Sequence, residues 1–197
     1  MRTFPKSRID ALTDGIFAFA MTLLVLDIRL PPDLPIHSDA DLIAHLRTLG
    51  SEYLAYLISF FVLAAQWRST IELRHAGEQV SSAALRWWTS YLFFITSMPF
   101  SCSVVGHYGN LAPAAWLYAA NIVIVGALSL PLRSLEIAPE HDLRARISRS
   151  KTLFVMATAL VSVAISLVSP GDAMYAYLLN LAGAPLVAWW HGSRDDA

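Results

Sequence analysis

Charged residues are scarce in this chain of 197 residues. Asp, Glu, Lys and Arg together make up 15% of it, whereas a soluble domain carries about 25%. Hydrophobic residues account for 56%, and the mean hydropathy is +0.51. Because long apolar runs accompany the low charge, the composition indicates an integral membrane protein, and we expect a single membrane domain over residues 1–197.

Basic stripes and cysteine pairs are also missing. The net charge is -1, and no cluster of Lys and Arg offers the surface that a phosphate backbone needs, so we expect no nucleic-acid partner. Cys102 is the single cysteine and cannot form an intrachain disulfide. Since it lies within an apolar stretch, we interpret it as a small buried hydrophobe.

Catalytic patterns are absent as well. There is no G-x-S-x-G or P-loop motif, and no His, Asp and Glu residues at metal-ligand spacing. The compact group Glu140-His141-Asp142 falls in a charged connection, where we interpret it as a solvated segment. We therefore predict that the protein is not an enzyme and holds no cofactor and no fixed metal.

Apolar stretches predict an all-α bundle of six membrane-spanning helices. They cover about residues 13–30, 53–67, 85–105, 114–132, 152–168 and 173–190. The first has eighteen residues, or roughly 27 Å of helix, which is close to the hydrocarbon thickness of a bilayer.

A short amphipathic helix is expected between the first two spans. Ser38 or Asp39 can cap it, and its apolar side carries Leu42, Ile43, Leu46 and Leu49. This helix could lie in the membrane interface or pack on the bundle.

Basic residues predict the orientation of the spans. They gather before the first span, between the second and third, between the fourth and fifth, and in the tail. On the alternate side only Arg29 and Arg47 occur. The positive-inside rule therefore places both termini in the cytosol.

One face of the first span carries Phe19, Thr22, Leu23 and Leu26, which follow the i, i+3, i+4, i+7 spacing of a helix. From the residues alone, the simpler interpretation is a lipid or packing surface with one threonine bonded to its own backbone, because apolar stripes are the norm in membrane helices.

A carboxylate, Asp14, stands in the first turns of this span, where it is costly unless it is functional or paired. Arg8 is a candidate partner. On one straight helix, however, the two lie about 9 Å apart along the axis and roughly 120° apart around it. A pair would have to cross to another helix or subunit, or need a break before Thr13. The alternative is that Arg8 snorkels and Asp14 caps the helix.

Residues 8–28, RIDALTDGIFAFAMTLLVLDI, resemble a family signature. The pattern RxxxFSDGVFAIAxTLLVLxI is typical of bacterial relatives of transmembrane protein 175, the endosomal and lysosomal potassium channels. Leu12 replaces the family's Phe, Thr13 its Ser, and Phe19 its usual Ile or Leu. Trp67 matches a tryptophan at the end of the second helix, but the histidine pair that often follows it is missing.

The resemblance implies a homotetramer in which the first helix of each subunit lines a central pore. It implies an apolar constriction at Phe19 and a polar layer at Thr22, near which a permeating potassium ion would sit. A further apolar layer falls at Leu26, and Leu23 completes the face. The resemblance also implies a network that anchors the pore helix, made by Arg8, Thr13 and Asp14.

From these features we predict a potassium-selective channel in a bacterial inner membrane. It would lack the TVGYG filter of ordinary potassium channels, so selectivity would come from side chains of the first helix. Its partners would be potassium ions, the lipid bilayer and further copies of the chain. The alternatives are a membrane scaffold or assembly protein that conducts nothing and, less favoured, a secondary transporter.

Overall fold

The computed structural model describes residues 3–72, 79–136 and 142–180. The chain is mostly helical, as predicted. In order, the elements are β1 (Thr3–Pro5), α1 (Lys6–Val25), α2 (Asp39–Thr48), α3 (Gly50–Glu72), β2 (Gln79–Ser81), α4 (Ser82–Tyr108), α5 (Ala112–Glu136), α6 (Asp142–Ser166) and the 3-10 helix η3 (Pro170–Leu178).

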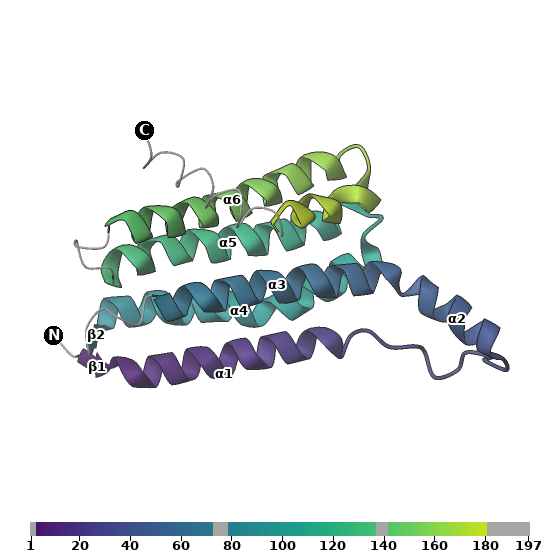
Figure 1. Ribbon diagram of the computed structural model, residues 1–197, viewed down its shortest axis with the longest axis horizontal. Coiled ribbons are helices and arrows are strands. Elements are labelled where there is room, and N and C mark those ends of the chain that lie inside the picture. The colour runs from purple at the N-terminus through teal and green to yellow at the C-terminus, as the bar shows by residue number, and fades with distance from the viewer. Residues whose placement is uncertain (1–2, 73–78, 137–141, 181–197) are drawn as a thin grey trace.

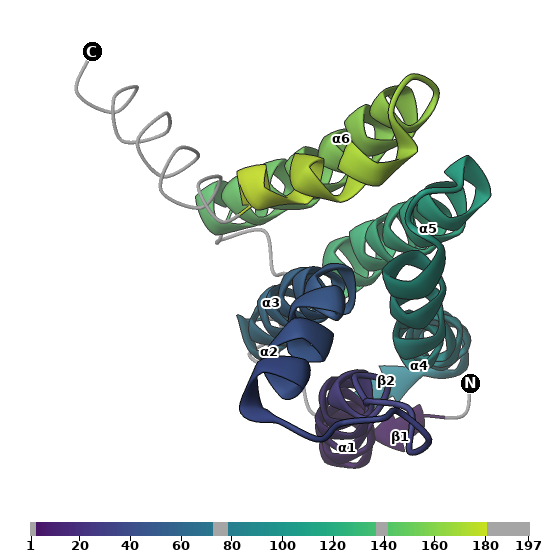
Figure 2. The ribbon, with the colours of Figure 1, turned by 90° about the vertical axis from the view of Figure 1, so that its right-hand side faces the viewer.

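The long helices run side by side along the molecule (Figure 1). Helix α4 lies at the centre and contacts α1, α3 and α5, while α6 packs on α5 and η3 packs on α6. Seen from the end, α1, α3 and α4 form one cluster from which α5 and α6 extend to one side (Figure 2). Helix α1 therefore stands at the edge of the subunit, with one side against the cluster and the other side open.

Within the described residues, four helices are long and apolar enough to cross a membrane. These stretches are Gly50–Ile71, Ser82–Tyr108, Ala112–Leu132 and Arg149–Ser166, and they overlap the second to fifth predicted spans. Helix α1 has 20 residues but carries Lys6, Arg8, Asp10 and Asp14 in its first half. Residues 181–190 of the sixth predicted span lie outside the described residues. The count of six spans thus remains a prediction.

The predicted first span, 13–30, has the wrong boundaries. Helix α1 begins at Lys6 and ends at Val25, with Leu26 as its C-terminal cap. Leu30 and Pro31 each precede a proline, which disfavours helical backbone at these two positions, but α1 ends five residues before Leu30. The early start excludes a break before Thr13. It also excludes helix capping by Asp14, which lies well inside the helix.

The sixth predicted span, 173–190, also begins differently. Residues 170–178 form the 3-10 helix η3, with Pro170 in its first turn, instead of the start of an α-helix. Two contacts hold the turn that precedes it: the Ser169 hydroxyl donates to Asp172 Oδ2 at 2.6 Å, and the Asp172 N–H donates to the Ser169 carbonyl at 3.1 Å.

The short amphipathic helix is confirmed as α2. Its cap is Ser38, whose Oγ accepts the N–H of Asp41 at 3.1 Å, and Asp41 Oδ2 in turn accepts the N–H of His37 at 3.2 Å. These hydrogen bonds, that of Ser38 first, lower the pKa of Asp41. No residue of α2 is buried, which argues against packing on the bundle of its own subunit.

A two-stranded sheet that the sequence analysis did not predict joins the start of α1 to the start of α4. Strands β1 and β2 pair antiparallel, with Phe4 opposite Val80. The sheet holds the first residue of α1 next to the first residues of α4, so the two helices begin at the same end of the bundle.

Helices α3 and α4 approach closely at Gly106. A Cβ added there would lie 3.3 Å from Glu52 Cα, which is backbone and cannot rotate away. Only glycine fits this crossing without moving a helix.

We therefore expect Gly106→Leu to lower the free energy of unfolding by about 1–3 kcal/mol, because overpacking forces the two helices apart. Thermal unfolding in detergent measures this change. Gly50→Ala is the matched control, since a Cβ at Gly50 meets nothing within 4 Å, and it should not lower the midpoint. Equal midpoints for Gly106→Leu and the unchanged protein would contradict the close crossing.

Candidate functional site

Helix α1 has two opposite faces. One face carries Thr13, Phe17, Ala20 and Leu24, all of which are buried. Phe17 meets Tyr91 of α4 with ring centroids 6.3 Å apart. This packing determines the rotation of α1 about its own axis, and so it decides which residues are left outside.

The residues left outside are those that the sequence analysis singled out. Phe19 is 72% exposed, Leu23 45% and Leu26 65%, and Thr22 is exposed as well. The structure brings these side chains together on the face turned away from the core of the subunit. An apolar surface of this kind on α1 is available to lipid or to another copy of the chain.

Thr22 bonds to its own helix. Its hydroxyl donates to the carbonyl of Phe19 at 2.9 Å, which is the backbone contact that the simpler interpretation of this face predicted. A hydroxyl that donates one hydrogen bond keeps its lone pairs, so the oxygen can still coordinate a cation. The bond therefore orients the oxygen without using its capacity to accept.

A shallow apolar groove of about 430 Å³ lies beside this face, between α1 and α4. Its lining includes Leu12, Gly15, Phe19 and Leu23 of α1 together with Thr96 of α4. A Cβ at Gly15 would meet nothing within 4 Å, so the glycine leaves the floor of the groove open. The groove offers no charged side chain and can hold only apolar groups.

Asp14 forms a hydrogen bond to another helix, as one of the expectations held, and the donor described for it is Trp67. The indole Nε1–H of Trp67 on α3 donates to Asp14 Oδ1 at 2.9 Å. Arg8 is exposed, and no ion pair joins it to Asp14 among the contacts of the described residues. Thr13 is buried and donates its hydroxyl to the carbonyl of Ile9, within α1.

The anchoring network of Arg8, Thr13 and Asp14 stays a prediction, to which the structure adds Trp67. Of Arg8, Thr13 and Asp14, only Asp14 makes a described hydrogen bond to another helix, and the tryptophan that matched the family pattern supplies the donor. The sequence analysis named both residues without joining them. The signal that could have joined them is the direction of the helices. Because α1 and α3 run antiparallel, a residue early in α1 and a residue late in α3 lie at the same level of the bundle.

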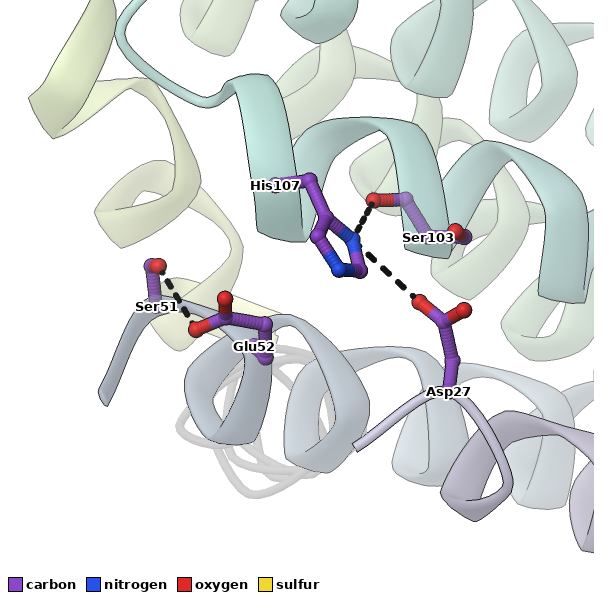
Figure 3. Close-up of polar contacts among 5 residues, drawn as sticks. All are labelled: Asp27, Ser51, Glu52, Ser103 and His107. Carbon is purple, nitrogen blue, oxygen red and sulfur yellow. Dashed lines mark hydrogen bonds and ion pairs between the residues drawn. The ribbon is translucent and has the colours of Figure 1, made fainter. Parts of the chain in front are cut away.

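A second polar contact, which the sequence analysis missed, lies at the other end of α1 (Figure 3). Asp27 follows α1 directly, and its Oδ2 lies 3.4 Å from Nδ1 of His107 on α4. The same nitrogen lies 3.0 Å from the carbonyl oxygen of Ser103. The side chains of His107 and Asp27 are 45% and 33% exposed.

No metal centre is found in the part of the chain that the structure describes. Over residues 3–72, 79–136 and 142–180, no group of three or more His, Cys, Asp or Glu residues is arranged to hold a metal ion. The candidate site therefore consists of the exposed face of α1 and two polar contacts, one at Asp14 in the first half of the helix and one at Asp27 just after its end.

Comparisons with known proteins agree with this description. Residues 8–99 match the family described as the endosomal/lysosomal potassium channel TMEM175. Over 101 residues the chain is 33% identical to a potassium channel of Chamaesiphon minutus, covering 51% of this chain and 49% of that protein. Over 67 residues it is 42% identical to an endosomal/lysosomal proton channel TMEM175 of Danio rerio, covering 32% of this chain and 13% of that protein.

A solved structure covers more of the chain. The crystal structure of a lysosomal potassium-selective channel TMEM175 homologue from Chamaesiphon minutus matches with a TM-score of 0.78 at 26% identity, over 92% of this chain and 97% of that one. In sequence, the match spans about half the length of the bacterial relative. The family consists of ion channels, not enzymes. These matches confirm the resemblance that the N-terminal motif predicted: the chain is similar to the TMEM175 channels, over residues 8–99 in sequence and over most of its length in fold.

Proposed function

We propose that the chain is a potassium-selective cation channel in which α1 of each of four subunits lines a central pathway. The observation that carries this proposal is the exposure of Phe19, Thr22, Leu23 and Leu26 on the outside of the subunit. The family resemblance supports it, since the family that matches residues 8–99 is described as a potassium channel and a similar bacterial protein carries that name.

The three layers of the face would act differently on an ion. Four Phe19 side chains around one axis form a dehydrated ring, which closes the path by excluding water. Thr22, one turn along, supplies four hydroxyl oxygens to an ion that has shed part of its hydration shell. Leu26 then forms a second apolar ring at the end of the helix. No TVGYG filter is needed in this arrangement.

Potassium is favoured over protons as the permeating ion, although vertebrate relatives are named as proton channels. Between Phe19 and Leu26 the helix carries no titratable side chain, so no relay of protonatable groups crosses the constriction. A threonine oxygen serves as a ligand for a metal cation. The pathway therefore suits a partly dehydrated cation better than a transferred proton.

In the proposed assembly the hydrogen bond between Asp14 and Trp67 anchors α1. The contact ties the first half of the pore helix to α3. In the orientation predicted from the basic residues, it lies toward the cytosolic side of a bacterial inner membrane, with both termini in the cytosol. Because Phe19 follows Asp14 by little more than one turn, the anchor also fixes the position of the constriction.

Reconstitution in liposomes tests the proposal. Liposomes that contain the purified protein should lose a potassium gradient faster than empty liposomes do. They should lose a sodium gradient more slowly than a potassium gradient. Absence of flux would support the scaffold interpretation. Flux that saturates steeply or requires a coupled ion would support a transporter, and proton flux without potassium flux would contradict the proposed selectivity.

The pore face generates a prediction for two variants. Phe19→Ala should raise potassium flux, because a smaller ring no longer excludes water. Thr22→Val keeps the shape and removes the oxygen, so it should reduce the preference for potassium over sodium. Flux measurements with gradients of either ion compare the two variants with the unchanged protein.

A matched control is Val25→Ala, which alters an exposed residue of α1 outside this face and should leave ion preference unchanged. Leu24 is unsuitable because it is buried, and Leu24→Ala would leave a cavity that costs about 2–5 kcal/mol. If Val25→Ala altered selectivity while Phe19→Ala and Thr22→Val did not, the pore would lie on another face.

The anchor generates a further prediction. Trp67→Phe removes the donor, and Asp14→Asn removes the charge of the acceptor. Each should lower assembly stability by about 1–3 kcal/mol, as expected for a hydrogen bond to a charged group. Because both changes remove one interaction, the double variant should lose less than the sum of the single losses, as thermal unfolding of the assembly in detergent would show.

Arg8→Gln combined with Asp14→Asn is the comparison pair. Since no ion pair between Arg8 and Asp14 is described, their effects should add within about 0.5 kcal/mol. Coupling between Arg8 and Asp14, with additivity between Trp67 and Asp14, would show that the anchor has been assigned to the wrong partner.

A further inference from the structure

The contact between Asp27 and His107 joins the C-terminal end of α1 to the last turn of α4. Asp27 is the residue directly after Leu26, the C-terminal cap of α1, and His107 lies in the last turn of α4. The pair is the ion-pair contact that the described residues show between the far end of α1 and the rest of the bundle. Beyond it the chain continues through residues 28–38 without helix.

The proton arrangement on His107 follows from its neighbours. Nδ1 faces two acceptors, the Ser103 carbonyl at 3.0 Å and Asp27 Oδ2 at 3.4 Å. A nitrogen between two acceptors must carry the hydrogen, so Nδ1 is protonated in the neutral ring as well. Protonation of Nε2 then adds a positive charge without moving the ring, and the contact with the Asp27 carboxylate becomes an ion pair.

Among the described groups near His107, Asp27 is the carboxylate that contacts the imidazole. Glu52 at the start of α3 lies on the other side of the ring in Figure 3, where Ser51 donates to its Oε2 at 3.0 Å, and no contact joins Glu52 to the imidazole. The ring of Tyr108 is tilted by 43° to the imidazole, with centroids 6.3 Å apart. Cys102 is buried and lies more than one helical turn before His107 in α4.

The backbone that carries His107 adjoins a close contact between α3 and α4. Its neighbour Gly106 is pressed against the backbone of Glu52, so the imidazole stands on the close crossing of α3 and α4. Asp27 follows the end of α1 and is continued by a segment without helix, so we expect a change in the strength of the contact to be seen on the Asp27 side.

We propose that Asp27 and His107 form a proton-binding clasp that holds the end of α1 against α4 when His107 is charged. Histidine changes charge between about pH 5 and pH 8. The clasp is closed at the acidic end of this range and loosens as the pH rises through it. Because Leu26 precedes Asp27, opening frees the last layer of the exposed α1 face.

Hydrogen exchange measured by mass spectrometry tests the clasp without requiring ion conduction, so its outcome is separate from the flux assay. The full-length protein in detergent is compared with His107→Gln, which can still donate to Asp27 but does not titrate. Position 107 lies outside the peptide covering residues 26–34, so the intrinsic exchange of that peptide is the same in both proteins at each pH.

At pH 5.5 the peptide should exchange about two- to fivefold more slowly in the unchanged protein than in His107→Gln, a size expected for a partly exposed ion pair. At pH 8 the two should exchange equally. In Asp27→Asn, once the exchange is corrected for the changed residue, the peptide should show no extra protection at pH 5.5 compared with pH 8. His45→Gln alters another histidine, in α2, and should retain the extra protection at pH 5.5.

The proposal would be overturned if the ratio of the exchange rates of this peptide in the unchanged protein and in His107→Gln were the same at both pH values. The contact would then not depend on charge. A pH-dependent difference that survives Asp27→Asn would overturn it too, since His107 would be acting through another group.

Discussion

The burial of one side of α1 against the rest of the subunit is the constraint on which the candidate site depends. Phe17 and Leu24 are almost completely buried, and because lipid is as apolar as these side chains, the energy that holds them inward is their van der Waals packing inside the bundle. That energy fixes the rotation of α1. With those residues inward, Phe19 and Leu26 must face outward, although both are as apolar as the residues of the core. The exposed face is therefore a consequence of the packing.

Polar contacts add specificity to this packing. Inside the bundle, the hydroxyls of Ser59 and Tyr118 lie 2.9 Å apart, and Asn121 donates to Ser97 and Ser101 across α4 and α5. Such bonds contribute only about 0.6 kcal/mol each in membrane bundles on average, but they select the partner helices. Helix α4, which takes part in most of these contacts, provides the frame against which α1 is placed.

Much of the fold follows from local patterns in the sequence. The spacing of Phe19, Thr22, Leu23 and Leu26 predicted one face, and the structure exposes all four. Ser38 was correctly named as a possible cap because capping is a local interaction. The end of α1 was predicted too late, since apolar residues continue past Val25 although the helix ends there.

Tertiary partners were the part that local reasoning could not supply. Asp14 was recognised as costly, but its hydrogen bond to Trp67 depends on how α3 lies beside α1. Asp27 and His107 are 80 positions apart, and neither has a neighbour in sequence that suggests the contact. The β1–β2 pairing was missed for the same reason, because three-residue strands carry no periodicity.

The central claim, that the exposed face of α1 surrounds the ion path, is tested most directly by cysteine accessibility. In a background with Cys102→Ser, Leu26→Cys and Val25→Cys are each treated with a positively charged thiol reagent during potassium flux. The account predicts that modification at position 26 blocks flux, because the added charge lies in the path, and that modification at position 25 does not. Block at position 25 with free flux at position 26 would contradict it.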